Sequence, residues 1–220
     1  RVVEERGLAA PGDEFDQAFR HVSYLVGLAF GRWDIRIGRD PDLAVVPKEL
    51  LAAPARHSPG MLLDATGQAA WSPPDGYPIT FPAEGILLDQ AGHPRDISAA
   101  VSTAGQEFSH SEQLLIDALA QLMTRPTLTG FLRSQFFKQH LAMYSMSRRR
   151  APIYWQLQVP SKTWGLWLYA PKLSREMLFA IVRETEQRQR LAEQQIGHLQ
   201  REGETGRGGR KAREVAKELE

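Results

Sequence analysis

Three adjacent arginines, Arg148, Arg149 and Arg150, are followed almost at once by the strand-like sequence Ile-Tyr-Trp. A guanidinium group binds two phosphate oxygens at the same time, and the hydroxyl of Ser145 or Ser147 could add a hydrogen bond to a phosphate. Cations at the end of a helix also stabilise the helix dipole, by about 0.3–1 kcal/mol each. That effect explains one arginine better than three. The run therefore favours contact with a polyanion over a solvated turn.

The charges are unevenly distributed along the chain, although the net charge is only +1. Residues 1–117 carry 17 acidic and nine basic side chains, residues 118–175 carry nine basic and no acidic ones, and residues 176–220 carry nine of each. The acid-free segment also holds nine of the 19 aromatic residues. A basic segment interleaved with aromatic residues is typical of nucleic-acid-binding surfaces.

This distribution suggests three parts. We interpret residues 1–117 as an acidic helical segment with a Pro/Gly-rich insert, residues 118–175 as a basic aromatic module made of a helix and a hairpin, and residues 176–220 as a charged helical hairpin.

The candidate DNA-binding residues all lie in the acid-free segment. We expect contacts to DNA from Arg133, Lys138, Ser147, Arg148, Arg149, Arg150, Lys162, Lys172 and Trp164. Only one face of a hairpin can be exposed, because successive strand residues point to opposite sides. At least half of Trp155, Trp164, Trp167 and Tyr169 are therefore expected in the core.

The elements that must position these residues are mainly helical. Apolar residues at helical spacing predict helices over about 14–30, 97–123 and 128–145. Residues 38–96 contain nine prolines and repeated glycine turns. That composition predicts either an irregular excursion with one or two short strands, notably 85–89, or a long packed loop.

The segment that follows changes from helix to strand and back. Residues 153–159 and 164–169 predict a hairpin with Lys162 at its exposed tip. A long polar helix is expected from Leu173 to about Glu202, with a Gly-rich break and a second helix behind it; the natural protein is expected to continue past Glu220. The expected class is α+β, mainly helical: a helical body with an irregular Pro/Gly-rich excursion, a small antiparallel hairpin and a C-terminal helical hairpin.

No catalytic chemistry can be assigned to particular residues. The chain has no cysteine, which excludes disulfides and cysteine-based zinc sites. His57, Asp89, His93 and Asp96 lack the spacing of metal ligands. The Asp and Glu-x-Lys pattern of nucleases is absent. We therefore expect no catalytic residue, metal or cofactor in this chain.

The segment Ser72–Tyr77, Ser-Pro-Pro-Asp-Gly-Tyr, requires a separate comparison. Amino-methyltransferases use an Asp/Asn/Ser-Pro-Pro-aromatic loop, in which the aromatic ring stacks on a flipped base. Here Asp75 occupies the aromatic position. We interpret the segment as a proline-rich turn.

The sequence shows no feature of a membrane protein. No window approaches 18 consecutive apolar residues, and no basic-then-apolar leader is visible. A cytoplasmic location without a membrane partner is expected.

Several segments resemble a known family. Residues 147–155, Ser-Arg-Arg-Arg-Ala-Pro-Ile-Tyr-Trp, followed by Leu-Trp-Leu-Tyr at 166–169, are similar to a signature of BREX-type, PglX-like adenine-specific DNA methyltransferases. These are relatives of the fused type IIG restriction–methylation enzymes. Upstream, residues 24–36, 58–61 and 85–89 resemble the same family in the same order.

The resemblance implies a region C-terminal to the catalytic domain. The family's Gly-rich S-adenosylmethionine motif and Asn-Pro-Pro-Tyr loop are absent, so no catalytic residue is carried over. The implied partners are double-stranded DNA, the methyltransferase domain and other proteins of the defence system. S-adenosylmethionine is implied only for the full-length protein. This region would hold the DNA backbone while the catalytic domain methylates N6 of an adenine.

A protein-interaction scaffold is the alternative. In that case residues 176–220 form a coiled-coil arm, and the arginines pair with an acidic partner or with the acidic residues of segment 1–117. Neither alternative requires an active site in this chain.

Overall fold

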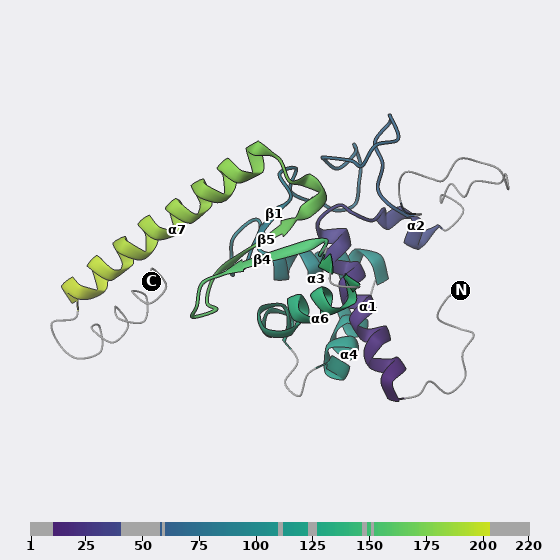
Figure 1. Cartoon of the computed structure of the whole chain (residues 1–220), viewed down its shortest axis with the longest axis horizontal. Helices are drawn as coiled ribbons and strands as arrows, with labels where there is room; N and C mark the ends of the chain where they lie inside the picture. The colour runs from purple at the N-terminus through teal and green to yellow at the C-terminus, as the bar shows by residue number, and fades with distance from the viewer. Residues whose placement is uncertain are drawn as a thin grey trace. The chain divides into compact units, whose positions relative to one another are not determined.

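The computed structural model confirms the expected α+β, mainly helical class (Figure 1). It describes residues 11–40, 58, 60–109, 112–122, 127–146, 149–150 and 152–202. The chain forms two compact units, one of Arg1–Pro82 with Ser98–His140, the other of Ala83–Ile97 with Leu141–Glu220. These boundaries follow packing and differ from the three segments defined by charge, which remain a division by composition.

The first unit is built on helix α1, Pro11–Ala29. Phe19, Val22 and Val26 are buried on one side of it, which is the apolar stripe predicted from the sequence. The helix ends at Gly31, whose φ of 70° is readily adopted only by glycine. The short helix α2, Ile35–Arg39, then begins because Asp34 accepts a hydrogen bond from the backbone N–H of Arg36.

Helices α3, Ile97–Ser109, and α4, Glu112–Leu122, occupy the region where a helix was predicted over 97–123. Helix α4 packs along α1 (Figure 1), and its buried face consists of Leu115, Ala118, Leu119 and Leu122. Burial of this apolar face supplies the main stabilising term for the pair.

The helix predicted over 128–145 is interrupted. It consists of α5, Leu128–Phe131, a π-helical turn η2, Leu132–Phe136, and α6, Phe137–Met143. Within this segment the hydroxyl of Ser134 donates to the carbonyl oxygen of Gly130 at 2.6 Å. Such a bond competes with the regular helical ladder, and glycine at that point weakens it further.

The π-helical turn places aromatic rings in the core of the first unit. Phe136 lies 5.5 Å from Phe19 and 5.8 Å from the imidazole of His140, measured between ring centroids. Burial, with a smaller contribution from the charge of Arg32, lowers the pKa of His140 to about 4. His140 is therefore a neutral core residue at pH 7.

The Pro/Gly-rich excursion is a long packed loop over residues 60–82. Isolated bridges Trp33↔Met61 and Leu63↔Ala69 order its first part. A small cluster of Leu62, Ala70 and Phe81, with Tyr77 against it, forms its core. The predicted strand over 85–89 is present as β1, Ile86–Leu88, in the second unit.

The second unit contains the predicted hairpin of β4, Tyr154–Gln158, and β5, Gly165–Tyr169. Strand β1 adds to the other side of β5, with Ile86 opposite Leu168, and gives an antiparallel sheet in the order β1-β5-β4. A separate two-stranded ribbon is formed by β2, Ser145–Met146, and β3, Arg149–Arg150.

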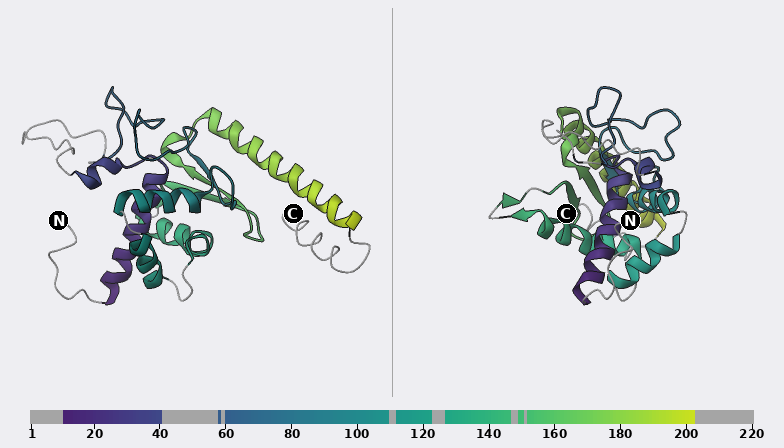
Figure 2. Two further views of the ribbon diagram at one scale, coloured as in Figure 1. Left: turned by 180° about the vertical axis from the view of Figure 1, so that it is seen from behind. Right: turned by 90° about the vertical axis from the view of Figure 1, so that its right-hand side faces the viewer.

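A short 3-10 turn η3, Ala170–Lys172, leads from β5 to the long helix α7, Arg175–Glu202, which Figure 2 shows from two further sides. The first turns of α7 cover one face of the sheet, where Met177 and Ala180 pack with a cluster of Ile86, Leu88, Trp164, Leu166 and Leu168. Arg95 forms an ion pair with Glu184 at 2.5 Å and so connects the segment after β1 to α7. The predicted second helical arm, over 203–220, lies outside the described residues.

Candidate nucleic-acid interface

The arginine run is part of a β-ribbon. Ser145 pairs with Arg150 and Met146 with Arg149, so β2 and β3 are antiparallel neighbours separated by two residues. Ser147 and Arg148, both predicted to contact DNA, lie outside the described residues. The backbone of Arg149 and Arg150 is thus in a strand, and a two-stranded ribbon is one of the elements that the major groove of DNA admits.

Lys162 lies where the sequence predicted it, at the exposed turn between β4 and β5. Its φ is 58°, the only positive value among the described non-glycine residues. The hydroxyls of Ser161 and Thr163 are 2.9 Å apart on either side of it. The turn therefore presents a cation together with two hydroxyl groups, all of them groups that bind phosphate oxygens.

Lys172 does not fit its predicted role as a surface contact to DNA. Its residue is only 4% exposed, and its side chain lies against Gly85: a Cβ added to that glycine would be 3.0 Å from the Cβ of Lys172. Burial lowers the pKa of Lys172 to about 8, against a smaller opposing effect of the Glu84 charge. This burial could not be predicted from the sequence, because a lysine after a strand is usually solvated.

The pKa of Lys172 predicts a dependence of stability on pH. Between about pH 8 and pH 10.5 the unfolded chain keeps this proton and the folded chain releases it, so the contribution of Lys172 to stability becomes more favourable as pH rises. At pH 7 the charge is buried at a cost. We expect Lys172→Met to raise the free energy of unfolding at pH 7 by about 1–3 kcal/mol, a gain that shrinks toward pH 10.5.

Urea unfolding of wild type and Lys172→Met at several pH values measures this difference. Lys162→Met is the matched control, since Lys162 is exposed, and it should leave the stability unchanged at every pH. A gain for Lys172→Met that is the same at pH 7 and pH 10.5 would contradict the explanation by charge burial.

Trp164 is likewise a core residue and not an exposed base-stacking residue. It is 5% exposed, and its indole Nε1 donates to the side-chain oxygen of Gln90 at 3.2 Å. It packs in the cluster between the sheet and α7. This corrects the prediction that Trp164 contacts DNA.

Trp155 is the exposed aromatic residue of the hairpin. The sequence made it one of four aromatic residues that could stack on bases, but it was not in the list of expected DNA contacts. It is 45% exposed, and so is Leu157 two residues along β4. Tyr154, Trp167 and Tyr169 are all at most 2% exposed. The alternation of side chains along β4 indicated that Trp155 and Leu157 share one face of the strand. What the alternation did not reveal is that this face stays exposed at β4.

Arg133 and Lys138 lie in the first unit, whereas the ribbon and the β4–β5 hairpin belong to the second. Arg133 is in the π-helical turn and half-buried, and Lys138 is exposed on α6. The predicted contacts are therefore distributed over two units. Only the second contains the arginine run, the Lys162 turn and Trp155.

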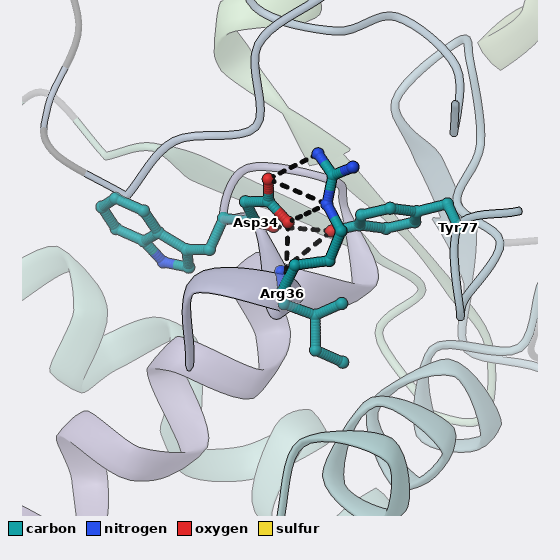
Figure 3. Close-up of polar contacts among 5 residues, drawn as sticks. Asp34, Arg36 and Tyr77 are labelled. Atoms are coloured by element: carbon teal, nitrogen blue, oxygen red, sulfur yellow. Dashed lines mark hydrogen bonds and ion pairs between the residues drawn. The ribbon is translucent and has the colours of Figure 1, made fainter. Parts of the chain in front are cut away.

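A second cluster of polar contacts lies in the first unit, around Asp34, Arg36 and Tyr77 (Figure 3). The Asp34 carboxylate accepts from Nε and Nη2 of Arg36, at 3.0 and 2.8 Å, and from its backbone N–H. The Tyr77 hydroxyl accepts from the backbone N–H of Ile35 at 3.0 Å and donates to the carbonyl oxygen of Trp33 at 3.3 Å. The guanidinium of Arg36 lies 5.4 Å from the Tyr77 ring centroid.

These contacts indicate a structural role for the cluster. Its hydrogen bonds join the start of α2 to the loop that contains Tyr77, and Asp34 is 7% exposed. Hydrogen bonding to Asp34 raises the pKa of Arg36, and burial raises that of Tyr77 to about 12, so neither group exchanges protons near pH 7. Neither the guanidinium nor the phenol therefore serves as a general acid or base near pH 7.

The segment Ser72–Tyr77 is a turn, as predicted. The backbone N–H of Tyr77 donates to the carbonyl oxygen of Pro74 at 3.0 Å, and Gly76 has a φ of 71°. His93 and Asp96 act within another turn, where they accept hydrogen bonds from the backbone N–H groups of Arg95 and Gln90. Within the described ranges, no three His, Asp or Glu side chains are placed to hold a metal ion.

No family model matches the chain, and no curated protein matches it. Among the described segments, no helix is both long and apolar enough to cross a membrane. The described strands of both sheets pair antiparallel.

Proposed function

We propose that the chain is a non-catalytic DNA-binding region, for target recognition or connection, of a cytoplasmic adenine-specific (N6) DNA methyltransferase of a phage-resistance or restriction–modification system. The observation that carries the proposal is the charge of residues 118–175, nine basic side chains and no acidic one. Duplex DNA binds such a segment through its phosphates, with release of condensed counterions. The segments that resemble PglX-like methyltransferases support the same assignment.

The structure adds two features that are compatible with the proposal. Arg149 and Arg150 lie in a narrow β-ribbon, and Lys162 lies in an exposed turn of the same unit. Both are elements that can approach a DNA backbone closely. The methyl donor and the adenine pocket would belong to the catalytic domain, and S-adenosylmethionine is proposed only for the full-length protein.

The proposal is tested by fluorescence anisotropy with a labelled duplex over a series of salt concentrations. If about four phosphates are contacted, log K should fall against log salt with a slope of about −3 to −4. Charge reversal of Arg148, Arg149 and Arg150 to Glu should weaken binding at least about tenfold at low salt and reduce that slope.

The matched control reverses three exposed arginines outside residues 118–175: Arg20 of α1 and Arg183 and Arg190 of α7. It changes the net charge by the same amount but is expected to retain most of the affinity. Equal losses of DNA affinity in the two triple variants would mean that binding depends only on the net charge of the chain. Absence of binding by the wild type at low salt would overturn the proposal.

A protein-interaction scaffold is the second candidate. The observation that favours it is a group of apolar side chains at the start of α7, Leu173, Leu178, Phe179 and Val182, which are 54–63% exposed. Exposed apolar side chains gathered in this way are typical of protein interfaces. In this case the triple arginine variant would change partner binding or stability, and its affinity for DNA would equal that of the wild type.

A further inference from the structure

The β4–β5 hairpin combines exposed apolar groups on β4 with a cationic turn. Trp155 and Leu157 are each 45% exposed on β4, and Lys162 follows in the turn. All three lie within the acid-free segment 118–175. An exposed aromatic ring and an exposed cation on one hairpin, in a segment without acidic residues, are the combination by which proteins bind bases and phosphates together.

The register shows on which face of the sheet these two side chains lie. Trp155 is opposite Leu168, and Leu157 is opposite Leu166. Directly opposed residues in antiparallel strands share a face, so Trp155 and Leu157 are on the face that α7 covers. Met177 and Ala180 pack on Leu166 and Leu168 of β5, whereas the β4 partners of these leucines stay half exposed.

The position of β4 in the sheet leaves this surface accessible. In the order β1-β5-β4, strand β4 is one of the two outer strands of the described sheet. The other large aromatic residues of the two hairpin strands, Tyr154, Trp167 and Tyr169, are buried. Core packing therefore accounts for the other aromatic rings but not for the exposure of Trp155.

We propose that Trp155, with Leu157 on the same face of β4, is a stacking platform for an unpaired base in DNA, while Lys162, in the turn that follows β4, contacts a phosphate further along the strand. This inference rests on the proposed DNA binding and specifies how the same unit contacts bases. The charge of the segment selects a nucleic acid over an apolar protein surface. In an intact duplex both faces of a base are covered by its neighbours, so an indole can stack only where a base is unpaired or unstacked.

The test compares two labelled probes by anisotropy: a perfect duplex, and the same duplex with a short single-stranded gap. The wild type should bind the gapped probe at least about tenfold more tightly, which is within the range measured for one stacked base. Trp155→Ala should lose this preference and keep the affinity and salt slope for the perfect duplex. Trp155→Phe should retain part of the preference, because a phenyl ring also stacks.

Trp71→Ala is the matched control, since Trp71 is 52% exposed but lies in the first unit. It should leave both affinities unchanged. Equal binding of the two probes by the wild type, or a preference that survives in Trp155→Ala, would overturn the platform and leave DNA binding standing. Failure of the wild type to bind either probe would overturn DNA binding itself. Self-association that disappears in Trp155→Ala, with DNA binding unchanged, would assign the surface to a protein contact and also overturn the platform.

Discussion

Replacement of Glu184 by methionine is expected to destabilise the second unit by about 3 kcal/mol, because it leaves the charge of Arg95 largely buried without its partner. The two side chains are 26% and 7% exposed, for Arg95 and Glu184 respectively. Their contact at 2.5 Å connects the segment after β1 to the third turn of α7. The loss should appear as faster amide hydrogen exchange in β1 and α7.

The double variant Arg95→Met/Glu184→Met distinguishes the net contribution of the ion pair to stability from the cost of leaving Arg95 without its partner. Buried ion pairs contribute little net stability compared with apolar residues of similar size, since desolvation offsets the attraction. The double variant should therefore recover to within about 1 kcal/mol of the wild type. Glu186→Met, on an exposed position of the same helix, should change stability by less than about 0.5 kcal/mol. A double variant as unstable as the single one would show that Glu184 acts through other contacts.

Much of the fold could be predicted because it depends on local periodicity. Helix α1 follows from the spacing of Phe19, Val22 and Val26, and the β4–β5 hairpin from two alternating segments around a short turn. The partner of β5 on its other side, β1, could not be predicted. Its pairing joins residues about 80 positions apart in the sequence, and no local pattern records such a contact.

The candidate site was predicted less well, and the reason is burial. Composition identifies the acid-free segment, but it does not distinguish Lys162, in an exposed turn, from Lys172, which packs against Gly85. It also does not distinguish Trp155 from Trp164. Both tryptophans flank the same turn, and their exposures differ because α7 and Gln90 cover only one of them.

The π-helical turn illustrates a further limit. Periodicity over 128–145 predicts one helix, and the residues that interrupt it, Gly130 and Ser134, are common in helices of ordinary geometry. Only the hydrogen bond between the Ser134 hydroxyl and the Gly130 carbonyl shows how they act together. The free-energy difference between a helix with this side-chain bond and one with regular backbone bonds is small. The surrounding aromatic packing therefore determines which of the two forms.

Trp164→Ala is expected to cost about 3–5 kcal/mol, the range for removing a buried tryptophan from a core. The indole is 5% exposed and packs with Leu166, Leu168 and Met177, so the variant leaves a cavity between the sheet and α7. Trp164→Phe should cost less, because it keeps a ring and loses mainly the hydrogen bond to Gln90, about 1 kcal/mol. Chemical unfolding, with hydrogen exchange of β5 to identify the affected unit, measures both.

The comparison with Trp155→Ala separates a core residue from a contact residue on the same hairpin. Trp155 is 45% exposed, so its removal should reduce stability by no more than about 1 kcal/mol while it abolishes the preference for an unpaired base. Trp164→Ala should do the reverse: lose stability and, at a temperature where it remains folded, keep that preference. A Trp164→Ala variant of unchanged stability that no longer binds DNA would show instead that Trp164 contacts the bases. Because the two tryptophans lie on either side of one turn, this pair of variants tests whether burial decides which aromatic residue is available to DNA.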